Sequence, residues 1–310
     1  MSAAIRIGTC SWADESLSKY FYPREVKGAE ERLRYYAERF DTVEANSTYY
    51  RLPDREMVQK WADRTPDGFV MHVKAFGVMT RHPVKVEQLP TDLREDAPRD
   101  ERGRVDRPPR EFRAEVFRRF RDALEPLRET RKLGGILMQF PPYVVPKPAS
   151  LDYLEWAHEQ LGADEMLVEF RHASWLDDEH RAETLAFLER NHMTYVIVDA
   201  PRTGARNVLP TVVATTSPTA YVRFHGRNAA TWNKRTGSAA ERFDHLYSED
   251  ELREWVEPLS ELAGESETVY AMFNNNGRSD TPTGTIAQAP VNAAQLRQLL
   301  VDAELPVVVP

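Results

Sequence analysis

Eight short runs rich in Val, Ile, Phe and Tyr recur along the chain, and most of them are followed by an amphipathic, helix-like stretch. The runs lie at residues 5–10, 41–46, 69–75, 134–140, 166–172, 194–200, 220–226 and 269–275. The helix-like stretches lie at residues 28–40, 54–64, 110–130, 150–161, 180–191, 250–263 and 290–301. Strand patterns that alternate with helix patterns predict βαβ units and a mainly parallel sheet.

The number of strands selects among the parallel-sheet folds. Eight strands with intervening helices in a chain of 310 residues favour an α/β fold of the TIM (β/α)8 barrel type, as one domain over residues 1–310. A doubly wound open sheet is the alternative, but no glycine-rich phosphate-binding sequence follows the first strand. Residues 80–109 are polar, charged and rich in Pro, and they predict an insertion after the third strand. Residues 201–219 look too short and too rich in Pro and Thr for a full helix.

Composition narrows the classes of function. The net charge of −8 disfavours a whole-surface nucleic-acid binder, although a small basic patch is compatible with it. No apolar run approaches the roughly 18 residues of a membrane span, and the first residues lack the features of a secretory signal. The single cysteine, Cys10, excludes an internal disulfide framework. We therefore expect a cytoplasmic protein with no membrane partner, and the oligomeric state stays open.

Polar and charged residues occur where the predicted strands end. In the stretch "DTVEANSTYY" (41–50), Glu44 and Asn46 share one face of the strand, while Val43 and Ala45 take the other. The same alternation points further polar residues inward, namely His72, Lys74, Gln139, Glu169, Arg171, Asp199, Arg223, His225, Asn274 and Asn275. Because catalytic groups of (β/α)8 barrels come from the carboxyl ends of the strands, we expect these side chains to converge on one cavity.

These residue types predict a site for a small anionic ligand, a phosphate ester or a carboxylate. Guanidinium groups bind such anions through paired hydrogen bonds, and a nearby ammonium group adds charge. The expected substrate-binding residues are Asn46, Tyr49, Lys74, Gln139, Arg171, Arg223, Trp232 and Asn274. The expected catalytic residues, which would move protons, are Glu44, Glu169 and His225. His72 lies deeper and is expected to be a hydrogen-bonded interior histidine.

A long loop follows the seventh strand at residues 226–248. Gly226 permits a close approach of the backbone to a ligand, and Trp232 with its basic neighbours could form a mobile lid. A solvated connection is the alternative. The basic residues of this loop are Arg227, Lys234, Arg235 and Arg242. They are the one hint of nucleic-acid binding, so nucleic acid is a disfavoured partner that is not excluded.

Two other functions fit the same residues. A metal-dependent phosphodiester hydrolase or nuclease would take ligands from Glu44, His72, Glu169, Asp199 and His225. No HExxH motif or close His/Cys spacing is present, so no cofactor is predicted, and a divalent metal is kept as an alternative. The third function is a non-catalytic ligand-binding or scaffold protein whose charges pair internally. If the protein is an enzyme, hydrolysis is the preferred reaction class.

Several longer motifs resemble a known family. They are "IGTCSW", "FYP" (21–23), "YYAERFDTVEANSTYYRLP", "GFVMHVKAF", "ILMQFPP", "VEFRHASW" (168–175), "YVRFHGR" and "FNNN". In this order they resemble the YecE-like family, number seventy-two in the domain-of-unknown-function series. The resemblance implies a TIM barrel and leaves the reaction open, because no reaction is assigned to the family. The motif residues it carries over are Glu44, Asn46, Lys74, Gln139, Glu169, Arg171, Arg223, His225 and Asn274.

Overall fold

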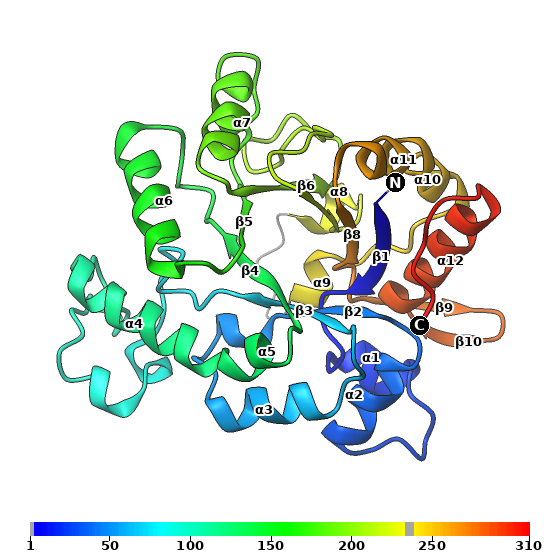
Figure 1. Ribbon diagram of the computed structural model, residues 1–310, viewed down its shortest axis with the longest axis horizontal. Helices are drawn as coiled ribbons and strands as arrows, with labels where there is room; N and C mark the ends of the chain where they lie inside the picture. Colours follow the sequence, from blue (N-terminus) through cyan, green and yellow to red (C-terminus); the bar gives the residue numbers. More distant parts are fainter. Residues whose placement is uncertain (1–2, 233–238) are drawn as a thin grey trace.

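Eight parallel strands close into a barrel in the computed structural model, which describes residues 3–232 and 239–310 (Figure 1). Each strand pairs with its sequence neighbours, and β1 pairs with β8 to complete the ring. The strands are β1 (Ala4–Thr9), β2 (Thr42–Ala45), β3 (Val70–Lys74), β4 (Leu133–Gln139), β5 (Met166–Glu169), β6 (Thr194–Asp199), β7 (Thr219–Phe224) and β8 (Thr268–Phe273). Every one of them overlaps a predicted strand, so the (β/α)8 barrel is confirmed.

The larger helices surround the strands and match the predicted stretches (Figure 1). They are α2 (Ala29–Ala37), α3 (Arg55–Asp63), α4 (Arg110–Ala123), α5 (Glu125–Glu129), α6 (Pro148–Leu161), α7 (Arg181–Arg190), α10 (Glu249–Arg253), α11 (Val256–Glu265) and α12 (Gln288–Asp302). Two predicted helices, 110–130 and 250–263, are each divided into two. A proline, Pro126 or Pro258, lies in the first turn of the second helix, where its missing N–H does no harm. As predicted, no helix forms within residues 200–218.

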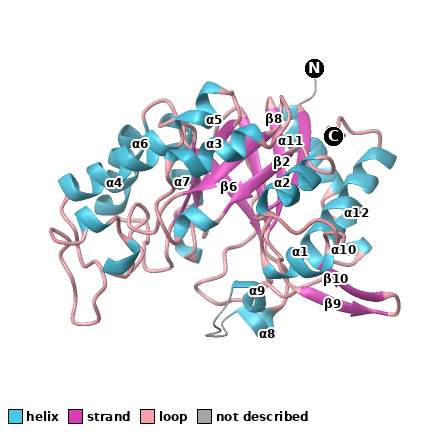
Figure 2. Cartoon of the chain, turned by 90° about the horizontal axis from the view of Figure 1, so that it is seen from below, coloured by secondary structure: helices cyan, strands magenta, loops and turns pink. Residues whose placement is uncertain are grey.

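Smaller elements escaped the sequence patterns. These are α1 (Glu15–Tyr20), α8 (Ala229–Trp232), α9 (Ala239–Arg242), and the hairpin of β9 (Arg278–Thr281) and β10 (Gly284–Ala287). Figure 2 shows this hairpin projecting from the body of the molecule next to α1. None of the helices in residues 3–232 and 239–310 combines the length and apolar composition that crossing a bilayer needs.

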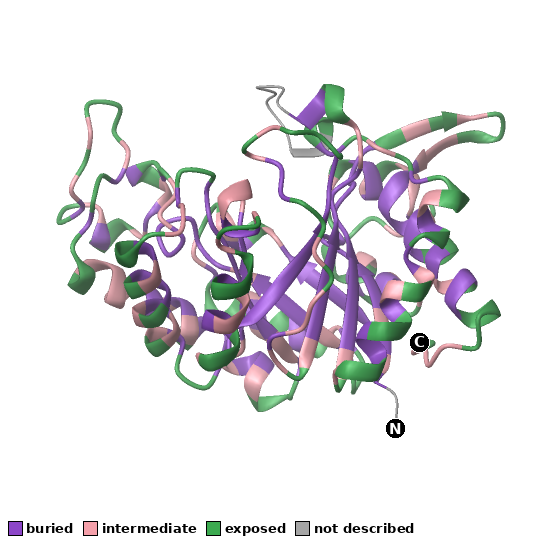
Figure 3. Cartoon of the chain, turned by 90° about the horizontal axis from the view of Figure 1, so that it is seen from above, coloured by how far each residue is buried: buried purple, intermediate pink, exposed green. Residues whose placement is uncertain are grey.

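The strands separate two apolar layers. Alternate residues such as Ile197 and Phe224 pack outward against the helices, whereas Val196 and Val198 pack inside the barrel. Figure 3 shows the barrel strands buried over most of their length, while the surrounding helices carry both buried and exposed residues. A parallel sheet that is covered on both faces explains why the predicted strands read as nearly continuous apolar runs.

A histidine stands in the barrel interior below the mouth. The His72 ring is completely buried and lies edge-on to Tyr221 and Tyr270, with ring centroids 4.7 and 4.3 Å away. The predicted interior position of His72 is confirmed, and neither of its ring nitrogens has a hydrogen-bond partner among the described residues. Burial lowers the pKa of His72 to about 3 and keeps it neutral. Gly134 makes room for it, because a Cβ there would lie 2.6 Å from His72 Nε2.

The predicted insertion forms a folded loop between β3 and α4. It contains two short 3-10 helices, Val86–Gln88 and Thr91–Leu93, and antiparallel bridges join Lys85 to Arg104 and Arg99 to Val105. A small apolar layer holds this polar segment in place; it consists of Val84, Val86, Leu89, Leu93, Ala97 and Val105. The insertion contributes His82 to the lining of the barrel mouth.

Candidate functional site

A fully buried ion cluster lies beneath the barrel mouth. Arg223, on β7, is placed between the carboxylates of Glu44, on β2, and Glu169, at the end of β5. Its Nη2 donates to Glu44 Oε1 at 2.6 Å, and its Nη1 donates to Glu169 Oε2. All three side chains have no exposed surface. Buried charges persist only when they are paired and hydrogen-bonded, and this geometry meets that condition.

Neutral donors complete the coordination of the two carboxylates. The Tyr221 hydroxyl donates to Glu44 Oε2 at 2.9 Å, and Gln139 Nε2 donates to Glu169 Oε1 at 2.8 Å. Burial opposes the ionisation of Glu169, but Arg223 and its other cationic neighbours outweigh it and hold the pKa of Glu169 well below its ordinary value. Glu169 is therefore a carboxylate at neutral pH.

His225 lies on the other side of Glu169, below an aromatic cover. Its Nε2 is 3.1 Å from Glu169 Oε1, and its Nδ1 is 2.8 Å from the Asn274 amide nitrogen. The Phe243 ring stacks on the imidazole at 4.9 Å, and Trp232 lies 6.1 Å away. Burial and the nearby arginines lower the pKa of His225 to about 3, so the imidazole is neutral at physiological pH.

Above this cluster the mouth opens into a cavity of about 510 Å³. Five predicted residues line its floor, namely Asn46, Lys74, Gln139, Arg171 and Asn274, and Tyr49 lines its wall. Glu44, Glu169, Arg223, His225 and Trp232 are buried and do not line it. The structure thus brings the predicted site residues together in two layers, and only the upper layer faces the cavity.

Lys74 and Arg171 are the two cations of the cavity floor. Lys74 Nζ donates to Gln139 Oε1 at 2.9 Å and lies 4.6 Å from the centre of the Tyr49 ring. Burial, with repulsion from Arg223, lowers the pKa of Lys74 to about 8. Arg171 Nε lies 2.7 Å from Glu169 Oε1.

The remaining face of Arg171 is held by aromatic rings, with Trp232 and Phe243 centred 5.4 and 5.6 Å from its Cζ. Cation–π contact of this kind orients a guanidinium group without neutralising it. Within residues 3–232 and 239–310, the Arg171 terminal nitrogens have no hydrogen-bond partner. They are available to a ligand in the cavity.

Some lining residues, among them Asp14 and His82, were missed by the sequence analysis. Asp14 is the important one, because it is the carboxyl group of the cavity wall, and burial raises its pKa to about 6 against the effect of Ser11. The signal that could have found it is the sequence "CSWAD", which directly follows the first strand. His82 belongs to the insertion, and burial lowers its pKa to about 3.

Some residues predicted to face the cavity lie elsewhere. Asp199 has the same orientation as the outward-facing Ile197, and it accepts from Arg227 Nε at 3.0 Å outside the central cluster. Asn275 points toward α12, where its Nδ2 donates to Asn292 at 2.8 Å. Both residues were predicted to point into the barrel, and both predictions are wrong. Lys234 and Arg235 lie outside the described residues.

The described residues provide no preorganised set of metal ligands. Residues 3–232 and 239–310 contain no group of three or more His, Cys, Asp or Glu side chains that could hold a metal ion. Arg223 occupies one oxygen of Glu44 and one of Glu169. A cation at these carboxylates would have to displace a guanidinium group.

The fold and the site define a class of protein, a (β/α)8 barrel whose C-terminal mouth carries a polar cavity above buried charges. Residues 6–308 match the family described as "Protein of unknown function DUF72". The chain belongs to this family, which is the one that its motifs predicted.

Relatives support the assignment over nearly the whole length. The chain is 29% identical to the UPF0759 protein YunF of Bacillus subtilis strain 168 over 299 residues, which cover 96% of this chain and 94% of that protein. A crystal structure of a DUF72 family protein from Thermotoga maritima MSB8 (TM1631) is 31% identical, with a TM-score of 0.72 and coverage of 96% and 99%. A DUF72 family protein from Enterococcus faecalis V583 (EF0366) gives a TM-score of 0.75 at 25% identity, with coverage of 96% and 95%.

Proposed function

We propose that this protein is an enzyme that binds a small anionic substrate, a phosphate ester or a carboxylate, in the mouth cavity and transforms it by acid/base chemistry. The supporting observation is that Lys74 and Arg171 face a cavity of about 510 Å³ while the carboxylates nearest to them are buried beneath. In the cavity lining and the cluster beneath it, four cations (Lys74, Arg171, Arg223 and Arg242) face three carboxyl groups (Asp14, Glu44 and Glu169). One positive charge therefore stays uncompensated even when Asp14 is ionised.

Arg171 and Lys74 make the anion contacts in this proposal. Arg171 is fixed by Glu169 and two rings, so little side-chain freedom is lost when its terminal nitrogens bind a ligand. Arg223 was expected to touch the anion as well. Because it has no exposed surface, it instead holds Glu44 and Glu169 in place below the floor.

Proton transfer falls to groups that reach the cavity and titrate near neutral pH. Asp14, with a pKa of about 6, and Lys74, with a pKa of about 8, meet both conditions. The predicted catalytic residues Glu44, Glu169 and His225 act as positioning residues in this account. Glu169 contacts the cavity residues Gln139 and Arg171, and His225 contacts Asn274, whereas Glu44 is linked to Glu169 through Arg223.

Sulfate binding to the purified protein tests the anion site. Titration calorimetry at pH 7 should show that Arg171→Ala weakens sulfate binding at least about tenfold, since a charged hydrogen bond contributes roughly 1.5–3 kcal/mol. Lys74→Met is a second variant that should weaken it as well. Arg118→Ala removes the same charge from the outer face of α4, where Arg118 pairs with Glu115 and Asp122, and it should bind sulfate like the parent protein. Equal affinity in all four proteins refutes the anion site.

A further inference from the structure

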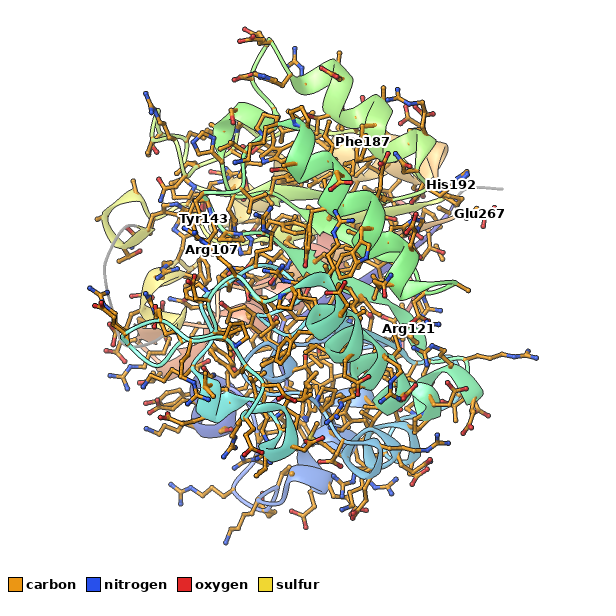
Figure 4. All side chains as sticks on the ribbon, turned by 90° about the vertical axis from the view of Figure 1, so that its left-hand side faces the viewer. Arg107, Arg121, Tyr143, Phe187, His192 and Glu267 are labelled. Atoms are coloured by element: carbon orange, nitrogen blue, oxygen red, sulfur yellow. The ribbon has the colours of Figure 1, made fainter. Side chains whose placement is uncertain are left out.

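A second hollow lies on the same end of the molecule, formed by the insertion and the start of α4. Its volume is about 360 Å³, and its lining includes Arg81, Arg107, Arg113 and Tyr143. Figure 4 shows Arg107 and Tyr143 close together, at the opposite end of the molecule from His192 and Glu267, which precede β6 and β8. The hollow therefore opens on the side of the barrel mouth.

Positive charge gathers in this hollow with little to balance it. The described residues form no ion pair with Arg81 or Arg113. Arg107 has only Asp106, at 4.0 Å, and the two side chains are 94% and 55% exposed. An ion pair this exposed contributes about 0–1 kcal/mol, so it does not neutralise the cluster.

Two of the three guanidinium groups, those of Arg81 and Arg113, are nevertheless held in place. Arg81 and Arg113 both lie over the buried Tyr153 ring, with Cζ at 5.2 and 5.6 Å from its centre. Arg113 Nη1 donates to the Pro108 carbonyl oxygen at 2.9 Å, and the Tyr143 hydroxyl donates to the Arg81 carbonyl oxygen. Burial lowers the pKa of Arg113, and the nearby Arg81 opposes its charge further. Three guanidinium groups thus share the hollow with one exposed carboxylate, Asp106, and guanidinium groups bind oxyanions through paired hydrogen bonds.

The backbone supports the same reading. Arg81 and Arg107 have φ angles of 65° and 43°, in the left-handed region that non-glycine residues seldom adopt. Both line this one hollow. Such strain persists where the surrounding structure fixes it, and it gathers at ligand sites.

We propose that this arginine hollow, lined by Arg81, Arg107 and Arg113, binds a phosphate-like oxyanion. His82 lines both the hollow and the mouth cavity, so the two spaces are neighbours. A ligand that carries two anionic groups then fits both, with one group at Lys74 and Arg171 and the other at the arginines. This last step rests on the proposed function, whereas the arginine hollow as an oxyanion site does not.

The test compares inorganic phosphate, a hexose monophosphate and a hexose bisphosphate by NMR titration of backbone amides and arginine Nε–H signals. The parent protein should show two phosphate sites, with signals of residues 81–113 moving together at one of them. The double variant Arg81→Gln with Arg107→Gln should lose that site and bind the bisphosphate about five- to tenfold more weakly. Arg118→Gln on α4 carries a matched charge loss and should change neither.

The outcomes separate the two proposals. If Arg171→Ala abolishes the other site and leaves the signals of 81–113 responding to phosphate, both are supported. If only residues 81–113 respond and Arg171→Ala has no effect, the arginine hollow stands and the proposed function fails. If the double variant responds to phosphate and to the bisphosphate like the Arg118→Gln control, the oxyanion site in the hollow is refuted.

Discussion

Replacement of Arg223 by methionine tests the buried cluster most severely. Methionine keeps an unbranched side chain but removes the charge and every hydrogen bond. Glu169 keeps Arg171 at 2.7 Å and Gln139 at 2.8 Å, but Glu44 keeps two neutral partners, the Tyr221 hydroxyl at 2.9 Å and the Cys10 thiol. The perturbation therefore leaves one carboxylate that has no exposed surface and no longer has its arginine partner.

The structure sets the size of the effect. Breaking a buried ion pair by removing one partner destabilises a protein by about 3–5 kcal/mol. Solvent does not screen these ion pairs, because Arg223, Glu44 and Glu169 are completely buried. We expect the free energy of unfolding of Arg223→Met to fall by about 3–5 kcal/mol at pH 7.5. A surface control, Arg118→Met, should stay within about 0.5 kcal/mol of the parent protein.

The loss should depend on pH in a fixed direction. Arg223 is the main cation that holds the pKa of Glu169 low, and a lowered carboxyl pKa stabilises the fold above the ordinary value of about 4.3 and less below it. In the variant, buried carboxylates can take up protons as the pH falls, so the deficit should shrink between pH 7.5 and pH 4.5. Urea unfolding followed by circular dichroism measures both values. A deficit below about 1 kcal/mol at pH 7.5, or one equal at both pH values, refutes the reasoning.

Two further predictions concern single side chains. Sulfate binding should weaken as the pH rises through about 6, because Asp14 then becomes an anion in the cavity wall. Calorimetry from pH 5 to pH 7 should show this decline in the parent protein and not in Asp14→Asn. An equal decline in both proteins would contradict the assignment. Tyr221→Phe removes the hydroxyl that donates to Glu44, and it should lower the free energy of unfolding by about 1.5–3 kcal/mol in urea; an unchanged midpoint would show that this hydrogen bond contributes nothing.

Sequence patterns were sufficient to predict the barrel and part of its polar lining. In β2, Glu44 stands between the apolar residues Val43 and Ala45, so the orientation of the strand could be read directly. In β6, the sequence "TYVIVD" is apolar on both faces, and nothing in it tells whether Val198 or Asp199 points inward. A strand covered on both sides loses the alternation that orientation assignments depend on.

The sequence also did not predict how deep each side chain lies in the barrel. Glu44 is paired in register with the interior His72, whereas Lys74 lies two residues further along β3 and reaches the cavity. Asp14 lies in the loop before α1, a helix too short to leave a periodic pattern. Arg81, Arg107 and Arg113 come together only because the insertion folds back between β3 and α4, which no local pattern records.

The central claim is that Lys74 and Arg171 hold an anion at the barrel mouth, and a crystal structure of the protein soaked in tungstate tests it most directly. Tungsten scatters anomalously, so the position of the oxyanion can be assigned without ambiguity. The account predicts an anomalous peak in the mouth cavity, with oxygen atoms in hydrogen-bond reach of the Arg171 terminal nitrogens and Lys74 Nζ. A saturating soak that leaves the mouth cavity without a peak, while Lys74 and Arg171 are ordered, would contradict it.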